Sequence, residues 1–248
     1  MRCKFILLLS ATGLFATCHK QDSPENGLLI DSSFEGNNPL RGWDNDQHCC
    51  DYSVVQSGDH FTEGSHALRL DIKDTDEQTS GSIRSELVQD NDDEGAERWY
   101  GFNMYLQNWE EDDAGEHVFQ WHPASNSQPA RVSLWTSGGR YQFVTNPDGG
   151  ANDYTDLGPV LSDQWVAWVV HIKWAENNNG ILQVWKNGKL VIDRHHIVTT
   201  TTAGNYFKLG INKFGWGSQP STVHERVLFF DEVRIGRADA GYEAVKPR

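Results

Sequence analysis

Short runs of alternating apolar and polar residues, separated by turn residues, make up most of the chain after residue 27. Successive side chains of a strand point to opposite faces, so a period of two is typical of half-buried β-strands. No stretch longer than two turns has the period of a helix. The pattern predicts at least ten strands, at residues 66–73, 82–88, 98–106, 117–122, 131–135, 140–145, 165–174, 180–195, 206–212 and 225–235.

The segment 180–195 contains a hairpin. Asn187 and Gly188 lie between two alternating arms, and Asn-Gly favours a two-residue hairpin turn because both positions need positive φ. Parallel sheets would need crossover helices, which the pattern does not provide. We therefore predict an all-β fold. It is a single-domain β-jelly roll, that is, a two-sheet antiparallel sandwich of the concanavalin-like kind, with a concave groove.

The N-terminal residues do not follow the strand pattern. Arg2 and Lys4 precede the apolar run 5–15, and small residues then lead to Cys18. This is the order of a secretory signal, and the apolar run is too short to span a bilayer. We predict a signal peptide at residues 1–17 with lipidation at Cys18, a polar tether at 18–27 and the jelly-roll domain at 28–248.

The chain is acidic, with 248 residues and a formal net charge of -14 at pH 7. This charge disfavours nucleic acid and anionic membrane surfaces as partners. We predict an exported monomer that contacts a membrane only through the lipid on Cys18. Its predicted location is the bacterial outer membrane, as a lipoprotein, or the cell surface, and otherwise the periplasm or the medium.

Two adjacent cysteines, Cys49 and Cys50, follow the signal. They could form a vicinal disulfide, bind a metal or remain buried thiols, and the sequence leaves these three alternatives open. The chain contains no CxxC and no HExxH motif, so a zinc site is not expected.

Three of the predicted strands carry functional groups at a spacing of two, which places them on one face. Each pair alone has an ordinary explanation, because surface ion pairs and single histidines are common. Their joint occurrence in an acidic chain favours a concave sheet that binds carboxylates. The groups are Arg84 and Glu86 in 82–88, Gln120 and His122 in 117–122, and Tyr206, Lys208 and Asn212 in 206–212.

The motifs RSEL, QWH and YFKLGIN, in this order, resemble the RxEL, QxH and YFKxGxY signatures of the jelly-roll polysaccharide lyases. That group contains alginate lyases, glucuronan lyases and the heparin lyase I type. The segments ERWYGFNMYL and ILQVWKNGKLV resemble the heparin lyase I type in particular, so the resemblance covers residues 28–236. It implies β-elimination on a uronic-acid-containing polysaccharide, glucuronan-, ulvan- or alginate-like, which leaves unsaturated uronate ends.

The resemblance also implies roles for the aligned residues. Gln120 and Arg84 would neutralise the substrate carboxylate, because the C5 proton is otherwise too weakly acidic to be removed. His122 would be the base or a second neutralising group. Lys208 would stabilise charge along the sugar, and Glu86 would orient Arg84.

Residue 212 departs from the resemblance, which places a catalytic tyrosine where this chain has Asn212. An amide cannot transfer a proton as a phenol does, so Tyr206 would take over, or Tyr141 or Tyr154 would reach in. Asn212 could instead bind the carboxylate. The predicted catalytic residues are His122, Gln120, Arg84, Tyr206 and Lys208, and the predicted substrate-binding residues are Asn212, Glu86, Tyr141 and Lys213.

A second resemblance concerns a metal. The segments FEG and FFDEVRIG resemble the paired terminal strands that hold a structural calcium ion in many sandwich carbohydrate-active proteins. It implies Glu35 and Asp231 as calcium ligands, whereas catalysis itself is expected to need no cofactor.

Two other functions remain as alternatives. Asn212 favours a non-catalytic cell-surface jelly roll that only binds carbohydrate. A glycoside hydrolase would need two carboxylates facing each other across the scissile bond, and no predicted strand carries such a pair on one face. For the lyase, the acidic charge and the lack of a dense Lys/Arg cluster favour an unsulfated or lightly sulfated polyuronate.

Overall fold

The computed structural model describes residues 27–125, 128–216 and 219–248. The predicted signal peptide, Cys18 and the tether up to residue 26 lie outside the described residues, so export and lipidation stay predictions. Within the described ranges, no helix is both long and apolar enough to cross a membrane.

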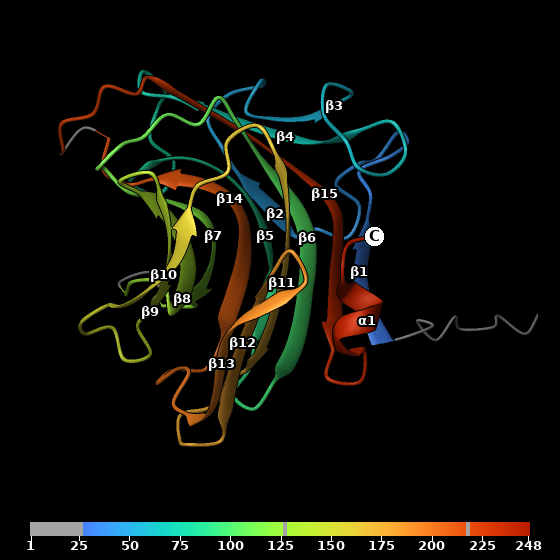
Figure 1. Cartoon of the computed structure of the whole chain (residues 1–248), viewed down its shortest axis with the longest axis vertical. Helices are drawn as coiled ribbons and strands as arrows, with labels where there is room; N and C mark the ends of the chain where they lie inside the picture. The colour runs from blue at the N-terminus through green and yellow to red at the C-terminus, as the bar shows by residue number, and fades with distance from the viewer. Residues whose placement is uncertain (1–26, 126–127, 217–218) are drawn as a thin grey trace, which may run out of the picture.

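Two sheets packed face to face contain all fifteen named strands of the described residues, and neither closes into a barrel (Figure 1). Every pairing between named strands is antiparallel. A short helix, α1 (Gly241–Val245), packs against β6 and β15 of the eight-stranded sheet. The predicted all-β jelly-roll sandwich is therefore confirmed.

The eight-stranded sheet has the order β13-β12-β11-β6-β15-β4-β3, and β1 also pairs with β15. Its strands are β1 (Leu28–Ser32), β3 (Val54–Ser57), β4 (Ala67–Lys73), β6 (Glu97–Gln107), β11 (Trp165–Lys173), β12 (Gly180–Lys186), β13 (Lys189–Ile197) and β15 (Glu225–Arg237).

The seven-stranded sheet has the order β10-β9-β8-β7-β14-β5-β2. Its strands are β2 (Asn45–Gln47), β5 (Ile83–Asp92), β7 (Glu116–Pro123), β8 (Val132–Ser137), β9 (Arg140–Thr145), β10 (Asp153–Pro159) and β14 (Asn205–Lys213).

All of the predicted strand segments are strands in the structure. The hairpin between β12 and β13 turns at Asn187 and Gly188, which have φ values of 50° and 75°, as an Asn-Gly hairpin turn requires. The sequence pattern missed β1, β2, β3 and β10. β2 has only three residues, and β10 is exposed along much of its length, so neither presents a clear apolar alternation.

The core lies between the sheets and fixes which face of each strand points outward. On β14, Phe207, Leu209 and Ile211 are at most 1% exposed, and the Phe207 ring lies 4.9 Å from that of Trp121. Burying a side chain of this size stabilises the fold by about 1.5–3 kcal/mol. The alternate residues of β14 must therefore lie on the outer face of the seven-stranded sheet.

Gly210 allows β14 and β5 to approach each other closely. Its φ is +142°, and a Cβ atom there would lie 2.2 Å from the Ser85 carbonyl oxygen and 2.7 Å from the Glu86 Cα. Any other residue would push the two strands apart. Glycine at this position therefore keeps Glu86 close to the polar residues of β14.

Candidate active site

A cavity of about 320 Å³ opens on the outer face of the seven-stranded sheet. Residues of β5, β7, β8 and β14 contribute most of its polar and aromatic lining. It is the place where the three motifs RSEL, QWH and YFKLGIN meet. The lining includes Arg84, His117, Gln120, His122, Trp135, Asn212 and Phe214.

Glu86 is the centre of the hydrogen-bond network beside the cavity. Its side chain is fully buried, Oε1 accepts from Gln120 Nε2 at 2.5 Å, and Oε2 accepts from Arg84 at 3.1 Å and Lys208 at 3.3 Å. Lys208 also donates to Gln47 Oε1 at 2.7 Å. One carboxylate thus faces two cations, which leaves a formal charge of +1 at the site.

The guanidinium of Arg84 is fully engaged by protein acceptors. It makes five hydrogen bonds, to Ser82 (twice), Gln47, Glu86 and the Ser80 carbonyl, and a guanidinium has five N–H groups. Arg84 therefore acts on a ligand mainly through its charge, because the donors that could bind a ligand directly are already used.

His122 has a defined tautomer. Its Nδ1 lies 2.8 Å from the Pro123 carbonyl oxygen, which can only accept, so Nδ1 carries the proton and Nε2 carries the lone pair. Burial is the main cause that lowers the pKa of His122 below its ordinary value of 6.5. His122 is therefore a neutral imidazole at neutral pH, with Nε2 able to accept a proton.

Tyr206 lies beside His122, with 3.3 Å between the phenol oxygen and His122 Nδ1. Burial, with a smaller contribution from Glu86, raises the pKa of Tyr206, so the phenol keeps its proton at neutral pH. Burial also lowers the pKa of Lys208. A neutral base and a protonated acid thus lie next to each other, opposite one another in the β7–β14 register.

His117 is a cavity residue that the sequence pattern missed. Strict alternation along 117–122 puts it on the core face with Phe119 and Trp121, but the register shifts at Val118, and both Val118 and Phe119 are in the core. This β-bulge turns His117 to the cavity side. No local sequence signal marks the bulge, because it shows only in the register with β8 and β14.

Two predicted substrate-binding residues lie elsewhere, and these predictions are corrected. Tyr141 is fully buried in the core against Trp168, on the same face of β9 as Phe143. Lys213 is fully buried in ion pairs with Asp112 and Glu116, away from the cavity lining. In both strands the alternation itself puts the side chain on the core face.

Tyr154, named with Tyr141 as a substitute acid, does not line the cavity but contacts its edge. Its ring is 51% exposed and lies 5.8 Å from that of Trp135, which does line the cavity. An exposed aromatic ring in this place can stack on a sugar ring, but it lies apart from the polar cluster of Glu86.

The two predicted calcium ligands anchor the segment before β4. Glu35 accepts from the backbone N–H groups of Ser65 and His66, both at 2.7 Å, and these contacts hold the pKa of Glu35 at about 2. Asp231 accepts from the backbone N–H of Thr62 at 2.7 Å and from Glu63 at 3.0 Å. N–H donors occupy the lone pairs that a cation would need, so this arrangement does not favour calcium, which stays a prediction.

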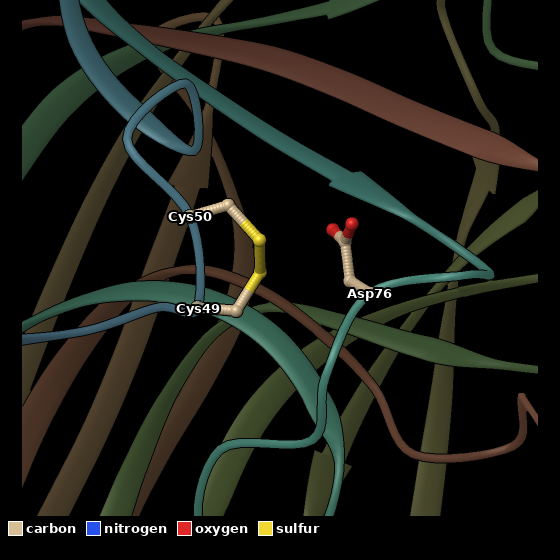
Figure 2. A group of neighbouring side chains, drawn as sticks. All are labelled: Cys49, Cys50 and Asp76. Carbon is tan, nitrogen blue, oxygen red and sulfur yellow. A yellow bond between two sulfur atoms is a disulfide. The ribbon is translucent and has the colours of Figure 1, made fainter.

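Cys49 and Cys50 form a vicinal disulfide, which selects one of the three alternatives left open by the sequence (Figure 2). Their sulfur atoms and an Asp76 carboxylate oxygen lie within 4.8 Å of one another. Asp76 already accepts from the Tyr52 hydroxyl and from the Lys73 backbone N–H. With both sulfurs bonded to each other, this group offers no thiolate ligand to a metal.

The fold is a two-sheet jelly roll with a polar cavity on the outer face of one sheet, and comparison with known proteins gives the family. A family model described as "Polysaccharide lyase" matches residues 35–234. The chain belongs to this family, and it is an enzyme that acts on polysaccharides. A search of curated protein sequences found no match.

Solved structures support the same fold. The endo-β-1,4-glucuronan lyase from the fungus Trichoderma reesei superposes with a TM-score of 0.69 at 22% identity, covering 88% of this chain and 96% of that chain. The family 7 alginate lyase A1-II' gives a TM-score of 0.59 at 13% identity, with coverages of 86% and 94%. The alginate lyase AlyC3 in complex with dimannuronate gives 0.51 at 12% identity, with coverages of 71% and 76%.

Proposed function

We propose that this polysaccharide lyase cleaves an unsulfated or lightly sulfated uronic-acid-containing polysaccharide by β-elimination. The observation that carries the proposal is the pairing of a site of formal charge +1, made by Arg84, Lys208 and Glu86, with the neutral base His122. A single surplus positive charge matches a single uronate carboxylate. The solved relatives named as glucuronan and alginate lyases support a substrate of this class.

The proposed reaction begins at C5 of the uronate. His122 Nε2 removes the C5 proton, and the electron pair of that bond forms the double bond between C4 and C5. The C4–O4 bond breaks, and O4 takes a proton from the Tyr206 hydroxyl. The charges of Lys208 and Arg84 stabilise the enolate that develops on the carboxylate.

One observation favours the alternative function, binding of carbohydrate without catalysis. Asn212 stands where the resemblance expects a tyrosine, so a chain that has lost catalysis and only binds glycan would look the same at this position. The intact His122–Tyr206 pair favours catalysis over this alternative.

The test follows the ultraviolet absorbance of the unsaturated uronate product, with glucuronan, alginate, ulvan and heparan-type polymers as substrates. We expect turnover on an unsulfated polymer, and a loss of roughly 10²- to 10⁴-fold for His122→Ala and for Tyr206→Phe.

The matched controls are His195→Ala and Tyr242→Phe, because His195 lies on β13 and Tyr242 on α1, both outside the seven-stranded sheet. Full activity of both test variants would refute the assigned roles. Binding of a polymer without any product would instead establish the glycan-binding alternative.

A further inference from the structure

A row of three polar residues crosses the cavity floor on neighbouring strands. In the strand register, Asn212 of β14 pairs with Arg84 of β5 on one side and with His117 of β7 on the other. The three side chains line the same cavity. The mechanism above uses the charge of Arg84 and leaves Asn212 and His117 without a role.

We propose that His117 and Asn212 form a pair of neutral hydrogen-bond donors that holds the uronate carboxylate and stabilises the enolate. The inference rests on the proposed β-elimination and assigns the part of the site that binds the carboxylate. Under it, residue 212 is a binding group rather than the remnant of a lost proton shuttle.

The amide of Asn212 is oriented by its neighbours. Its Oδ1 accepts from the Ser82 hydroxyl at 2.7 Å, and Ser82 in turn accepts from Arg84 at 2.6 and 3.1 Å. Since the oxygen is held, Nδ2 is directed to the other side, and no described residue accepts from it. The side chain is 7% exposed, so this donor is nearly buried and borders the cavity.

The ring of His117 is held between two aromatic side chains. It lies 5.0 Å from the Trp135 ring and 5.1 Å from the Phe214 ring, and it is 9% exposed. Nδ1 is buried without a hydrogen-bond partner. A buried N–H without an acceptor is costly, so the proton belongs on Nε2, which leaves Nε2–H as the donor that can serve a ligand in the cavity.

His117 remains neutral over the ordinary pH range. Burial chiefly lowers its pKa to about 3, and the neighbouring His122, Arg84 and Lys208 act in the same direction. Neutrality excludes His117 as an acid at neutral pH but suits a hydrogen-bond donor, because a neutral N–H group needs no counter-charge within the cavity.

Arg84 and the pair of His117 and Asn212 would act on the carboxylate in different ways, for a physical reason. Arg84 uses its five N–H groups on the protein, so it attracts a carboxylate by charge but cannot bind it directly without breaking its own contacts. Asn212 and His117 supply the missing donors, because both lie in the same row of paired positions as Arg84. Donors fixed in place before the reaction lose no free energy by reorienting as charge builds on the enolate.

The experiment compares His117→Ala, His117→Gln and His117→Asn. The glutamine amide reaches the place of Nε2, whereas the asparagine amide reaches only that of Nδ1. For each variant, kcat, KM and the pH profile are measured on glucuronan, and the binding of glucuronic acid oligomers is measured by calorimetry. Thermal unfolding midpoints identify variants that lose their fold.

We expect kcat/KM to fall roughly 10- to 100-fold in His117→Ala and His117→Asn, as for loss of a hydrogen bond to a charged group. His117→Gln should recover most of this loss, and the acid limb of the pH profile should not move in any variant. The matched control is His171→Ala, since His171 is also buried and also lies against a tryptophan ring, Trp99, but belongs to β11 of the other sheet.

If His117→Gln folds but is as inactive as His117→Ala, His117 is a proton-transfer group and the proposal is overturned. The same holds if the acid limb of the pH profile moves in both variants. Wild-type kinetics in His117→Ala would also overturn the proposal. If the wild type makes no product from any polymer, the proposed β-elimination is wrong. The binding of glucuronic acid oligomers then decides whether His117 and Asn212 form a donor pair. Weaker binding by His117→Ala supports the donor pair, whereas equal binding, or none by the wild type, overturns it.

Discussion

β14 carries two buried lysines, five residues apart, that belong to two different ion clusters. Lys208 lies in the groove cluster, with Arg84 and Glu86. Lys213 lies in the inter-sheet cluster, with Asp112, Glu116 and Arg226. The odd spacing puts the two lysines on opposite faces of the strand.

The two clusters differ in their balance of charge. The inter-sheet cluster pairs two cations with two carboxylates, the Lys213 ammonium also donates to the Ala114 carbonyl, and the Arg226 guanidinium stacks 4.4 Å from the Trp109 ring. Its formal charges therefore balance. The groove cluster keeps one cation in surplus beside a cavity. The balanced cluster can hold the fold together, whereas the surplus cation beside the cavity suits the negatively charged ligand that we propose.

The largest expected effect comes from breaking the balanced cluster. Lys213→Met leaves two buried carboxylates with one cation, so the free energy of unfolding should fall by about 3–5 kcal/mol. Chemical denaturation measures this change. The turnover of the folded fraction should fall far less than in Lys208→Met, and an unchanged denaturation midpoint would show that the inter-sheet cluster is not structural.

Breaking the unbalanced cluster should affect catalysis first. Lys208→Met leaves Glu86 paired with Arg84, so the fold should lose less stability than in Lys213→Met, while kcat should fall roughly 10²- to 10³-fold for lack of enolate stabilisation. Kinetics and denaturation of the two methionine variants, measured side by side, test the comparison. If both lose stability equally and neither loses turnover, the distinction between the clusters is wrong.

The smallest expected effect is on the pH profile. His122 must be neutral to act as the base, and its pKa is lowered below 6.5, so kcat/KM should hold at neutral pH and fall tenfold per unit below that lowered pKa. Lys208 is one of the causes that lower the pKa of His122. The midpoint of the acid limb should therefore move upward in Lys208→Met and stay in place in Lys213→Met. A downward shift would contradict the assignment.

The sequence predicted most of the fold and much of the site. Apolar alternation is a local property of a strand, and it alone placed Arg84 with Glu86, Gln120 with His122, and Tyr206 with Lys208 and Asn212. The hairpin at Asn187 likewise needed only the preference of two residues for positive φ.

The wrong and missing site predictions have two different causes. Tyr141 and Lys213 were predicted to bind the substrate although their own alternation puts them on the core face, so a stricter use of the pattern would have removed them. His117 could not be found in this way, because a bulge reversed the alternation.

The sequence by itself determined most of the strands, their buried faces and the outward-facing groups of β5, β14 and the Gln120–His122 pair, because these follow from a period of two and from the burial of large apolar side chains. Only the tertiary structure decided the disulfide between Cys49 and Cys50, the saturation of Arg84 by its neighbours, and the approach of His117 to Asn212. Each of these depends on the register and contacts between segments far apart in the chain, which no local pattern encodes.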